Sequence, residues 1–219
     1  MRGIVWIFLL SINFTFAQVY SFKTQKEGRT VTHRILMDAE YLIETQFVEY
    51  PPMFISTRGG FYSKKGNAYT VTFEFNSDHP KDGLTSLVLE PDESWEDVSK
   101  TSLDLNGKWL MSGRVRDNKE QRRDTSRPRK TMKFLEDGFF QWIAFNTETF
   151  EFFGSGGGYY TAQEGKYTEH IEYFSRSNSS VGRVLPFEYS ISGSDWHHQG
   201  FSSKGDAMHE IWSKRTLNE

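Results

Sequence analysis

One carboxylate stands among large apolar side chains in a segment of alternating pattern. From Tyr167 to Tyr173 apolar and polar residues alternate, and Glu169 falls on the apolar side, between Tyr167 and Ile171. Burying a carboxylate is costly unless it is paired or protonated. We therefore expect Glu169 to orient a ligand in a cavity, to pair with a neighbouring Lys, Arg or Tyr as part of the core, or to be turned outward by a bulge.

Histidines gather in the second half of the sequence, at positions 170, 197, 198 and 209. His170 and Glu172 share one strand face, but compact metal-binding spacings such as H-x₃-H do not occur in the sequence. Solvent exposure is the favoured interpretation of that face. Neighbouring strand residues point to opposite sides, so only one of His197 and His198 can reach a cavity. We assign no metal site, cofactor or catalytic residue.

Two further stretches have simpler interpretations. The glycines at 156–158 lack the following Lys-Ser/Thr of a phosphate-binding loop and open a Tyr-rich strand, so they indicate a kink that lets a sheet curl. The basic residues between Arg114 and Lys130 are interspersed with acids and predict a solvated loop, which in an alternative interpretation contacts an acidic surface or a glycan.

Composition limits the class of protein. The 219 residues include 19 Phe, 10 Tyr and 6 Trp but no Cys, and 25% are charged. Many aromatic residues and glycines are typical of strands and tight turns. The formal net charge of −3 provides no basic field, so we expect no nucleic-acid partner.

The N-terminal segment is typical of an export signal. Residues 1–17 open with Arg2, continue with an apolar run and end with Thr15 and Ala17 at small-residue cleavage positions. The run is too short to span a bilayer easily, so we expect no membrane embedding after cleavage. An exported chain without cysteine is more typical of bacteria than of eukaryotes. We predict a periplasmic or secreted bacterial protein.

The remaining chain matches itself at an offset of 98 residues, which places Gly59 on Gly157. From Gly59 to Phe75, six of the seventeen aligned pairs are identical. Both halves show strand-like alternation, as in the stretches 41–47, 69–75, 139–145 and 167–173, with turn signals between them. We predict an all-β protein built by internal duplication. Only Pro91 to Lys100 is predicted to be helical, as a short linker.

A family resemblance follows from the second half. Gly107 and Trp109 form a Gly-x-Trp on its first strand, and Trp212 and Arg215 close its last strand. With the aromatic strands between them, these residues resemble the lipocalin-like (calycin-type) domains of uncharacterised secreted bacterial proteins. The resemblance implies an antiparallel barrel in which Arg215 or Lys214 packs on Trp109. Residues 105–219 would form this domain, and 18–104 a degenerate and less complete repeat of it.

The favoured function is non-catalytic binding of a small hydrophobic or amphipathic molecule in the barrel of residues 105–219. The expected ligand-binding residues are Phe139, Gln141, Phe145, Tyr160, Tyr167, Glu169, Trp196 and His198. One alternative is a protein- or glycan-interaction module with filled barrels. The other, less favoured, is an acid/base or metal-dependent enzyme that uses Glu169 with a histidine.

Overall fold

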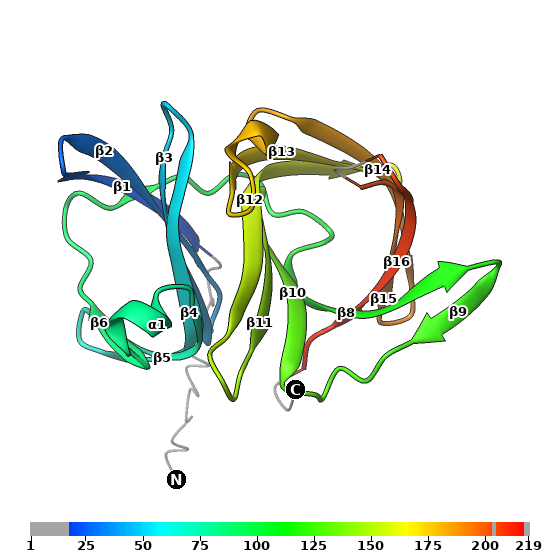
Figure 1. The fold of residues 1–219 in the computed structure, drawn as a ribbon, viewed down its shortest axis with the longest axis horizontal. Coiled ribbons are helices and arrows are strands. Elements are labelled where there is room, and N and C mark those ends of the chain that lie inside the picture. The colour runs from blue at the N-terminus through cyan, green and yellow to red at the C-terminus, as the bar shows by residue number, and fades with distance from the viewer. Residues whose placement is uncertain (1–17, 203–204, 217–219) are drawn as a thin grey trace, which may run out of the picture.

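The chain is all-β, as predicted, in a computed structural model that describes residues 18–202 and 205–216 (Figure 1). The expected signal peptide, residues 1–17, lies outside the described residues. Two antiparallel sheets contain all the described strands. A four-residue helix α1, His79–Asp82, and a 3₁₀ turn, Asn178–Ser180, lie in the connections.

The first sheet has seven strands, and its order is β6-β5-β4-β3-β2-β1-β7. Their bounds are β1 Gln18–Lys26, β2 Arg29–Met37, β3 Tyr41–Val48, β4 Met53–Lys65, β5 Ala68–Asn76, β6 Ser86–Leu89 and β7 Glu96–Asp97. The second sheet comprises β8 Gly107–Arg116, β9 Lys119–Arg122, β10 Arg129–Glu136, β11 Phe139–Asn146, β12 Phe152–Gln163, β13 Lys166–Phe174, β14 Val184–Ser192, β15 Asp195–Phe201 and β16 Ala207–Lys214.

The second sheet closes into an eight-stranded barrel. Strands β10 to β16 follow one another as a meander, and β8 pairs with both of its ends, β10 and β16. Strand β9 extends β8 as a hairpin that projects from the barrel (Figure 1). Closure removes the unpaired sheet edges, and it brings residues far apart in the sequence around one interior.

The strands β2 to β6 repeat the pairing of β10 to β14. Thr32 pairs with Phe47 as Lys130 pairs with Phe145, and Tyr69 pairs with Leu89 as Tyr167 pairs with Phe187. Register shifts fall at matching places, before Phe47 and Phe145 and again before Gly60 and Gly158. A Cβ at Gly60 would lie 1.9 Å from the Thr72 carbonyl oxygen, and one at Gly158 would lie 2.0 Å from that of His170. Both bulges therefore require glycine.

The first sheet stays open because it lacks two closing strands. Tyr20 pairs with Ile35 as Trp109 pairs with Lys133, so β1 occupies the place of β8. After β6, however, the chain crosses to the other edge and adds only the two residues of β7 to β1. The centroid of the Trp95 ring lies 5.2 Å from that of Phe22, and Trp95 packs against the apolar cluster of the first sheet. The prediction of a less complete first unit is thus confirmed.

The linker helix predicted for Pro91 to Lys100 is wrong. This segment, which the structure describes throughout, contains a turn and strand β7 but no helix. The Asp92 carboxylate accepts hydrogen bonds from the Ser94 backbone N–H and hydroxyl, which forms a local turn in place of a helix cap. Pairing of Glu96 and Asp97 with β1 then holds the chain extended.

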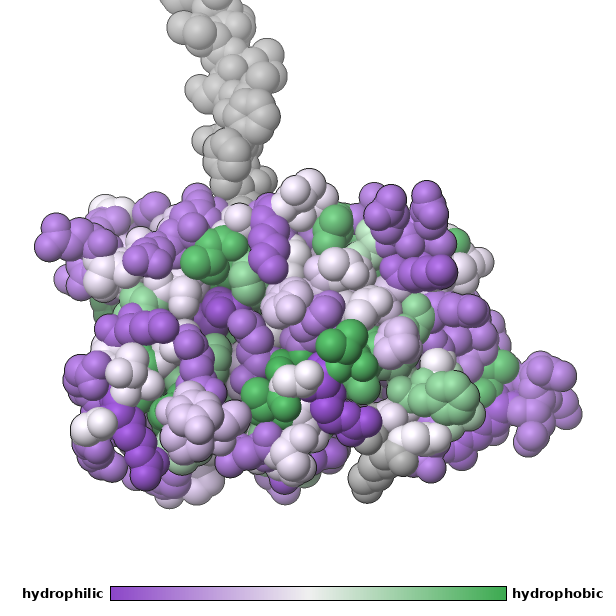
Figure 2. All heavy atoms as spheres, turned by 90° about the horizontal axis from the view of Figure 1, so that it is seen from above, coloured by the Kyte–Doolittle hydropathy of each residue, from purple (hydrophilic) through white to green (hydrophobic). Residues whose placement is uncertain are grey.

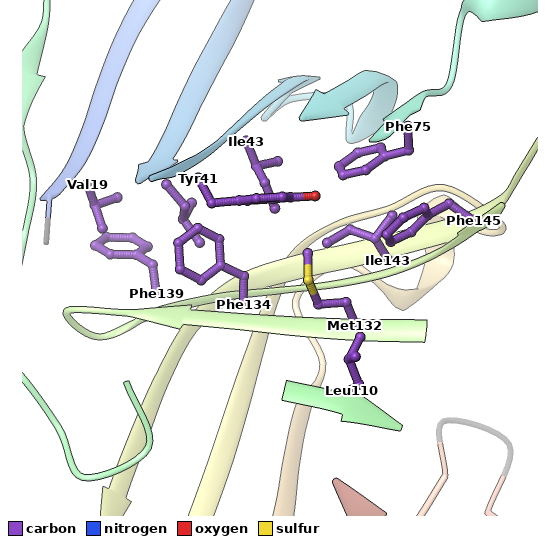
Figure 3. Close-up of a cluster of buried hydrophobic side chains, with 11 residues drawn as sticks. Val19, Tyr41, Ile43, Phe75, Leu110, Met132, Phe134, Phe139, Ile143 and Phe145 are labelled. Atoms are coloured by element: carbon purple, nitrogen blue, oxygen red, sulfur yellow. The ribbon is translucent and has the colours of Figure 1, made fainter. Parts of the chain in front are cut away.

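A large apolar core joins the two sheets. It packs β1, β3 and β5 against β10 and β11 of the barrel (Figure 3). Figure 3 shows Val19, Tyr41, Ile43 and Phe75 on one side and Phe134, Phe139, Ile143 and Phe145 on the other. The Phe75 and Phe145 rings lie 5.0 Å apart, and Phe47 meets Tyr173 at 4.9 Å. The barrel wall at β11 is therefore buried on both faces.

The face of the molecule seen in Figure 2 is mainly hydrophilic. Figure 2 shows hydrophobic residues on one face as small separate patches among hydrophilic ones. Among the described residues, no helix has the length and apolar character needed to cross a membrane.

Candidate functional site

A cavity of about 340 Å³ lies within the barrel. Its lining comes mainly from seven strands of the barrel and mixes apolar with polar side chains. The apolar ones include Met111, Ala144, Ile171, Leu185, Phe187, Met208 and Trp212. The side chains of Lys133, Glu169, His198 and Glu210 also reach it. A concave apolar space with a few placed polar groups is the usual form of a small-molecule site.

A buried ion pair lies deep in this cavity. The Lys133 ammonium is 2.7 Å from Glu169 Oε1, and both side chains are only 6% exposed. The Tyr167 hydroxyl donates a hydrogen bond to the same carboxylate oxygen at 3.0 Å. The Lys133 nitrogen also lies 5.0 Å from the Trp196 ring centroid and 5.2 Å from that of Trp212, close enough for cation–π attraction. Glu169 therefore points inward, as expected, and has a basic partner.

This ion pair occupies the positions at which the first sheet has an apolar pair. In the shared register, Lys133 corresponds to Ile35 and Glu169 to Val71. Ile35 and Val71 belong to one apolar cluster. The two changes in the barrel are complementary, because a charge of either sign alone would be costly at such depth.

His198 is a neutral polar group beside the ion pair. Its side chain is 1% exposed, and neither ring nitrogen has a hydrogen-bond partner among the described residues. Glu210 Oε2, at 3.7 Å from Nδ1, is beyond hydrogen-bond distance. Burial and the nearby Lys133 charge lower the pKa of His198 to about 4. At neutral pH the imidazole can therefore offer one donor and one acceptor to a bound molecule.

One end of the barrel is filled by aromatic residues. Trp109, Tyr160 and Trp196 pack there in one buried cluster with Leu105. The Trp109 indole N–H donates to the Leu105 carbonyl oxygen at 2.8 Å. Lys214 lies over the Trp109 ring, with its nitrogen 5.6 Å from the centroid. Of the two residues that the resemblance allows for this contact, the structure has Lys214.

Arg215 reaches the first sheet instead. Its guanidinium forms a two-pronged salt bridge with Glu74, at 2.7 and 2.8 Å, and lies 5.4 Å from the Tyr41 ring centroid. The salt bridge outweighs burial and raises the pKa of Arg215 above its usual range. Arg215 thus fastens the last strand of the barrel to β5. The other signature residues, Gly107 and Trp212, lie at the start of β8 and inside the barrel.

Three of the expected ligand-binding residues face away from the cavity. Phe139 and Phe145 lie in the core between the sheets. Gln141 accepts a hydrogen bond from Thr45 and donates to Thr57 and Ser155, all at 2.8–2.9 Å. These three residues therefore do not line the cavity, because β11 is buried on both faces and they lie on the face that packs against the first sheet.

The remaining expected residues divide between the cavity and its closed end. Glu169 and His198 line the cavity, while Tyr167, Tyr160 and Trp196 lie in the aromatic cluster beside it. Tyr160 donates a hydrogen bond to Asn106 at 2.8 Å. Alternation holds at the paired histidines, because His197 points outside to His209, with a 3.1 Å contact between ring nitrogens. No cluster of three His, Asp or Glu side chains suited to a metal occurs within residues 18–202 and 205–216.

Several cavity residues were not predicted from the sequence. Lys133 was not singled out, although its offset partner Ile35 marks the position as buried. Arg114, Arg123, Arg129 and Arg176 also line the cavity. Three of these four belong to the stretch assigned to a solvated loop.

Comparisons with known proteins identify a family but no activity. The family described as a domain of unknown function (DUF4488) matches residues 104–219, more than half of the chain. A crystal structure of an uncharacterised protein from Bacteroides eggerthii DSM 20697 is similar, with a TM-score of 0.35 and 14% identity over 51% of this chain and 100% of that one. No curated protein matches. The chain belongs to the DUF4488 family.

Proposed function

We propose that this protein binds a small hydrophobic or amphipathic molecule, without catalysis, in the cavity of the barrel. The observation that carries the proposal is the cavity of about 340 Å³, whose lining combines apolar side chains with buried polar groups. A solid barrel would bring those side chains into mutual contact and leave no space for a ligand. The apolar wall would supply affinity through burial, and the polar groups would fix orientation.

The polar groups suit orientation better than acid–base chemistry. Glu169 Oε1 already accepts hydrogen bonds from Lys133 and Tyr167, which leaves that oxygen poorly placed to take a proton from a substrate. His198, with its pKa lowered to about 4, is a weak base at neutral pH. Its unpartnered nitrogens would instead hydrogen-bond a hydroxyl or carbonyl group of the ligand.

We further infer that the chain is an exported tandem duplication of a lipocalin-like unit. The shared register of β2–β6 and β10–β14 supports the duplication. The closed meander and the Lys214 contact with Trp109 support the lipocalin-like character. The Arg-led apolar run of residues 1–17 supports export to the periplasm or the medium.

Native mass spectrometry of the protein purified from its own host tests the binding proposal. The wild-type chain should carry a stoichiometric organic species that denaturation releases. An Ala144→Phe variant, which places a ring into the cavity, should lose that species. Thr161→Phe adds the same ring at an exposed position outside the cavity lining and should retain it. A species held equally by all three proteins would contradict the proposal and favour an interaction surface elsewhere.

A further inference from the structure

The cavity lining carries an excess of positive charge. It contains five cationic side chains, Arg114, Arg123, Arg129, Arg176 and Lys133, against two carboxylates, Glu169 and Glu210. The chain as a whole has the opposite sign, with a formal net charge of −3. Lys133 is neutralised by Glu169 deep in the barrel. The excess therefore belongs to the arginines, which we call the arginine cluster (residues 114, 123, 129 and 176).

Most of this cluster lacks an acidic partner. Arg114 lies 3.5 Å from Glu210, but Arg123, Arg129 and Arg176 form no ion pair with any carboxylate in the described part of the chain. Other arginines do find carboxylates, as Arg122 does with Glu120 and Asp195. The lack of acidic partners is therefore specific to arginines that line the cavity, and does not extend to every arginine of the β8–β10 segment.

The guanidinium groups are held by other contacts. Arg129 stacks on the Phe153 ring, 3.3 Å from its centroid, and Arg176 donates two hydrogen bonds to the Phe153 carbonyl oxygen at 2.9 and 3.2 Å. All four arginines of the cluster are solvent-exposed, and partial desolvation together with the charges of Arg129 and Arg114 lowers the pKa of Arg123. Like charges that line one cavity repel each other, and a bound anion would relieve that repulsion.

The apolar wall and the arginine cluster belong to one space. Side chains of both kinds line the same cavity, with Ile171, Phe187 and Trp212 on the apolar side. A ligand that satisfies both must combine an apolar body with an anionic group. Arginine suits carboxylate, sulfate and phosphate because its planar fork of donors matches their oxygens.

We infer that the ligand is an amphipathic anion whose apolar body lies in the barrel and whose anionic group binds the arginine cluster. This inference rests on the proposed function and adds the chemical class of the ligand. Octanoate, octanol and octylamine form a probe series with one apolar chain and a negative, neutral or positive head. Their affinities can be measured by isothermal titration calorimetry at low ionic strength.

We expect octanoate to bind the wild-type protein about tenfold more tightly than octanol, because each partly exposed charge contact contributes a few-fold. Octylamine should bind more weakly than both. The difference should shrink at about 0.15 M salt, since exposed charges are screened. The paired variant Arg123→Gln/Arg129→Gln should lose the preference and bind octanoate no better than octanol.

Two further variants make the result specific. Arg127→Gln removes a charge from the same segment at a side chain that is 76% exposed and outside the cavity lining, so it should behave as wild-type. Arg123→Glu should shift the preference toward octylamine. Thermal unfolding of each variant checks that the barrel is intact.

The outcomes separate the inference from the proposed function. Equal binding of octanoate and octanol to the wild-type protein, or an octanoate preference that survives the paired substitution, would overturn the anionic class and leave cavity binding in place. Binding of none of the three probes would overturn both.

Discussion

Replacement of the buried ion pair by its apolar counterpart from the first sheet should be tolerated only when both residues change together. The substitutions are Lys133→Ile and Glu169→Val, which copy Ile35 and Val71. At 2.7 Å and an effective dielectric constant of about 20, the attraction between the two charges is about 6 kcal/mol. Desolvation of two ions costs several kcal/mol each, so the pair contributes little net stability.

The single variants should differ sharply from the double variant. Either substitution alone leaves a buried charge without its partner and should lower the free energy of unfolding by about 3–5 kcal/mol. The double variant should lie within about 2 kcal/mol of the wild-type protein or exceed it, because well-packed apolar residues replace buried ion pairs without loss. Urea denaturation at neutral pH measures all four proteins and gives the coupling energy of the cycle.

A matched exposed pair provides the control. Lys23 and Glu49 lie 3.2 Å apart at the surface, with side chains 55% and 56% exposed. Lys23→Ile and Glu49→Val should show a coupling energy below about 1 kcal/mol. If the effects of the Lys133 and Glu169 substitutions on the free energy of unfolding added up, as at the surface, the two buried charges would not depend on each other and the prediction would be refuted.

Three further variants test the electrostatics and the contact between the sheets. The pKa of Glu136 is raised to about 8 by burial and by Asp137 and Asp38, so the free energy of unfolding should fall as pH rises from about 4.5 through 8. Glu136→Gln should remove this pH dependence from the free energies measured by urea denaturation. An unchanged pH dependence in the variant would assign it to other groups. The pKa of His198 is lowered, so stability should fall by a few kcal/mol as pH drops from about 6.5 toward 4, and His198→Leu should abolish this loss in the same assay. Gln141→Leu removes the hydrogen-bond partner of the buried Thr45 and Thr57 hydroxyls between the sheets. It should lower the melting temperature and reduce the free energy of unfolding by about 1–3 kcal/mol. An unchanged melting temperature would show that these hydroxyls find other partners.

Local pattern was sufficient for most of the strands. Alternation identified β5 and β13, and glycine-containing turns ended their hairpins, as at Glu164 and Gly165, both with positive φ. Such features depend on residues close in sequence. The segment 91–100 failed because its two strand residues pair with β1, some 75 positions away, as in the Tyr20–Asp97 pairing.

The candidate site was only partly predictable for the same reason. Glu169 and His198 were found because each is polar among aromatic neighbours on its own strand. Lys133 could have been found from the alignment of the sequence with itself, in which Lys133 falls on Ile35. A Lys at a position that is buried and apolar in the other half requires a nearby acid. The arginine cluster could not, because its members come together only when β8 closes on β10 and β16. The position of Phe139 and Phe145 between the sheets was not predicted, because periodicity shows that a strand face is apolar but not whether a ligand or a second sheet covers it.

A crystal structure of the protein with octanol tests cavity binding most directly. We expect the alkyl chain to lie inside the barrel, between Ile171 and Phe187, with its hydroxyl near His198. The same experiment on Ala144→Phe should show no bound chain. A wild-type structure in which side chains fill the barrel interior and octanol lies only on the outer surface would contradict cavity binding.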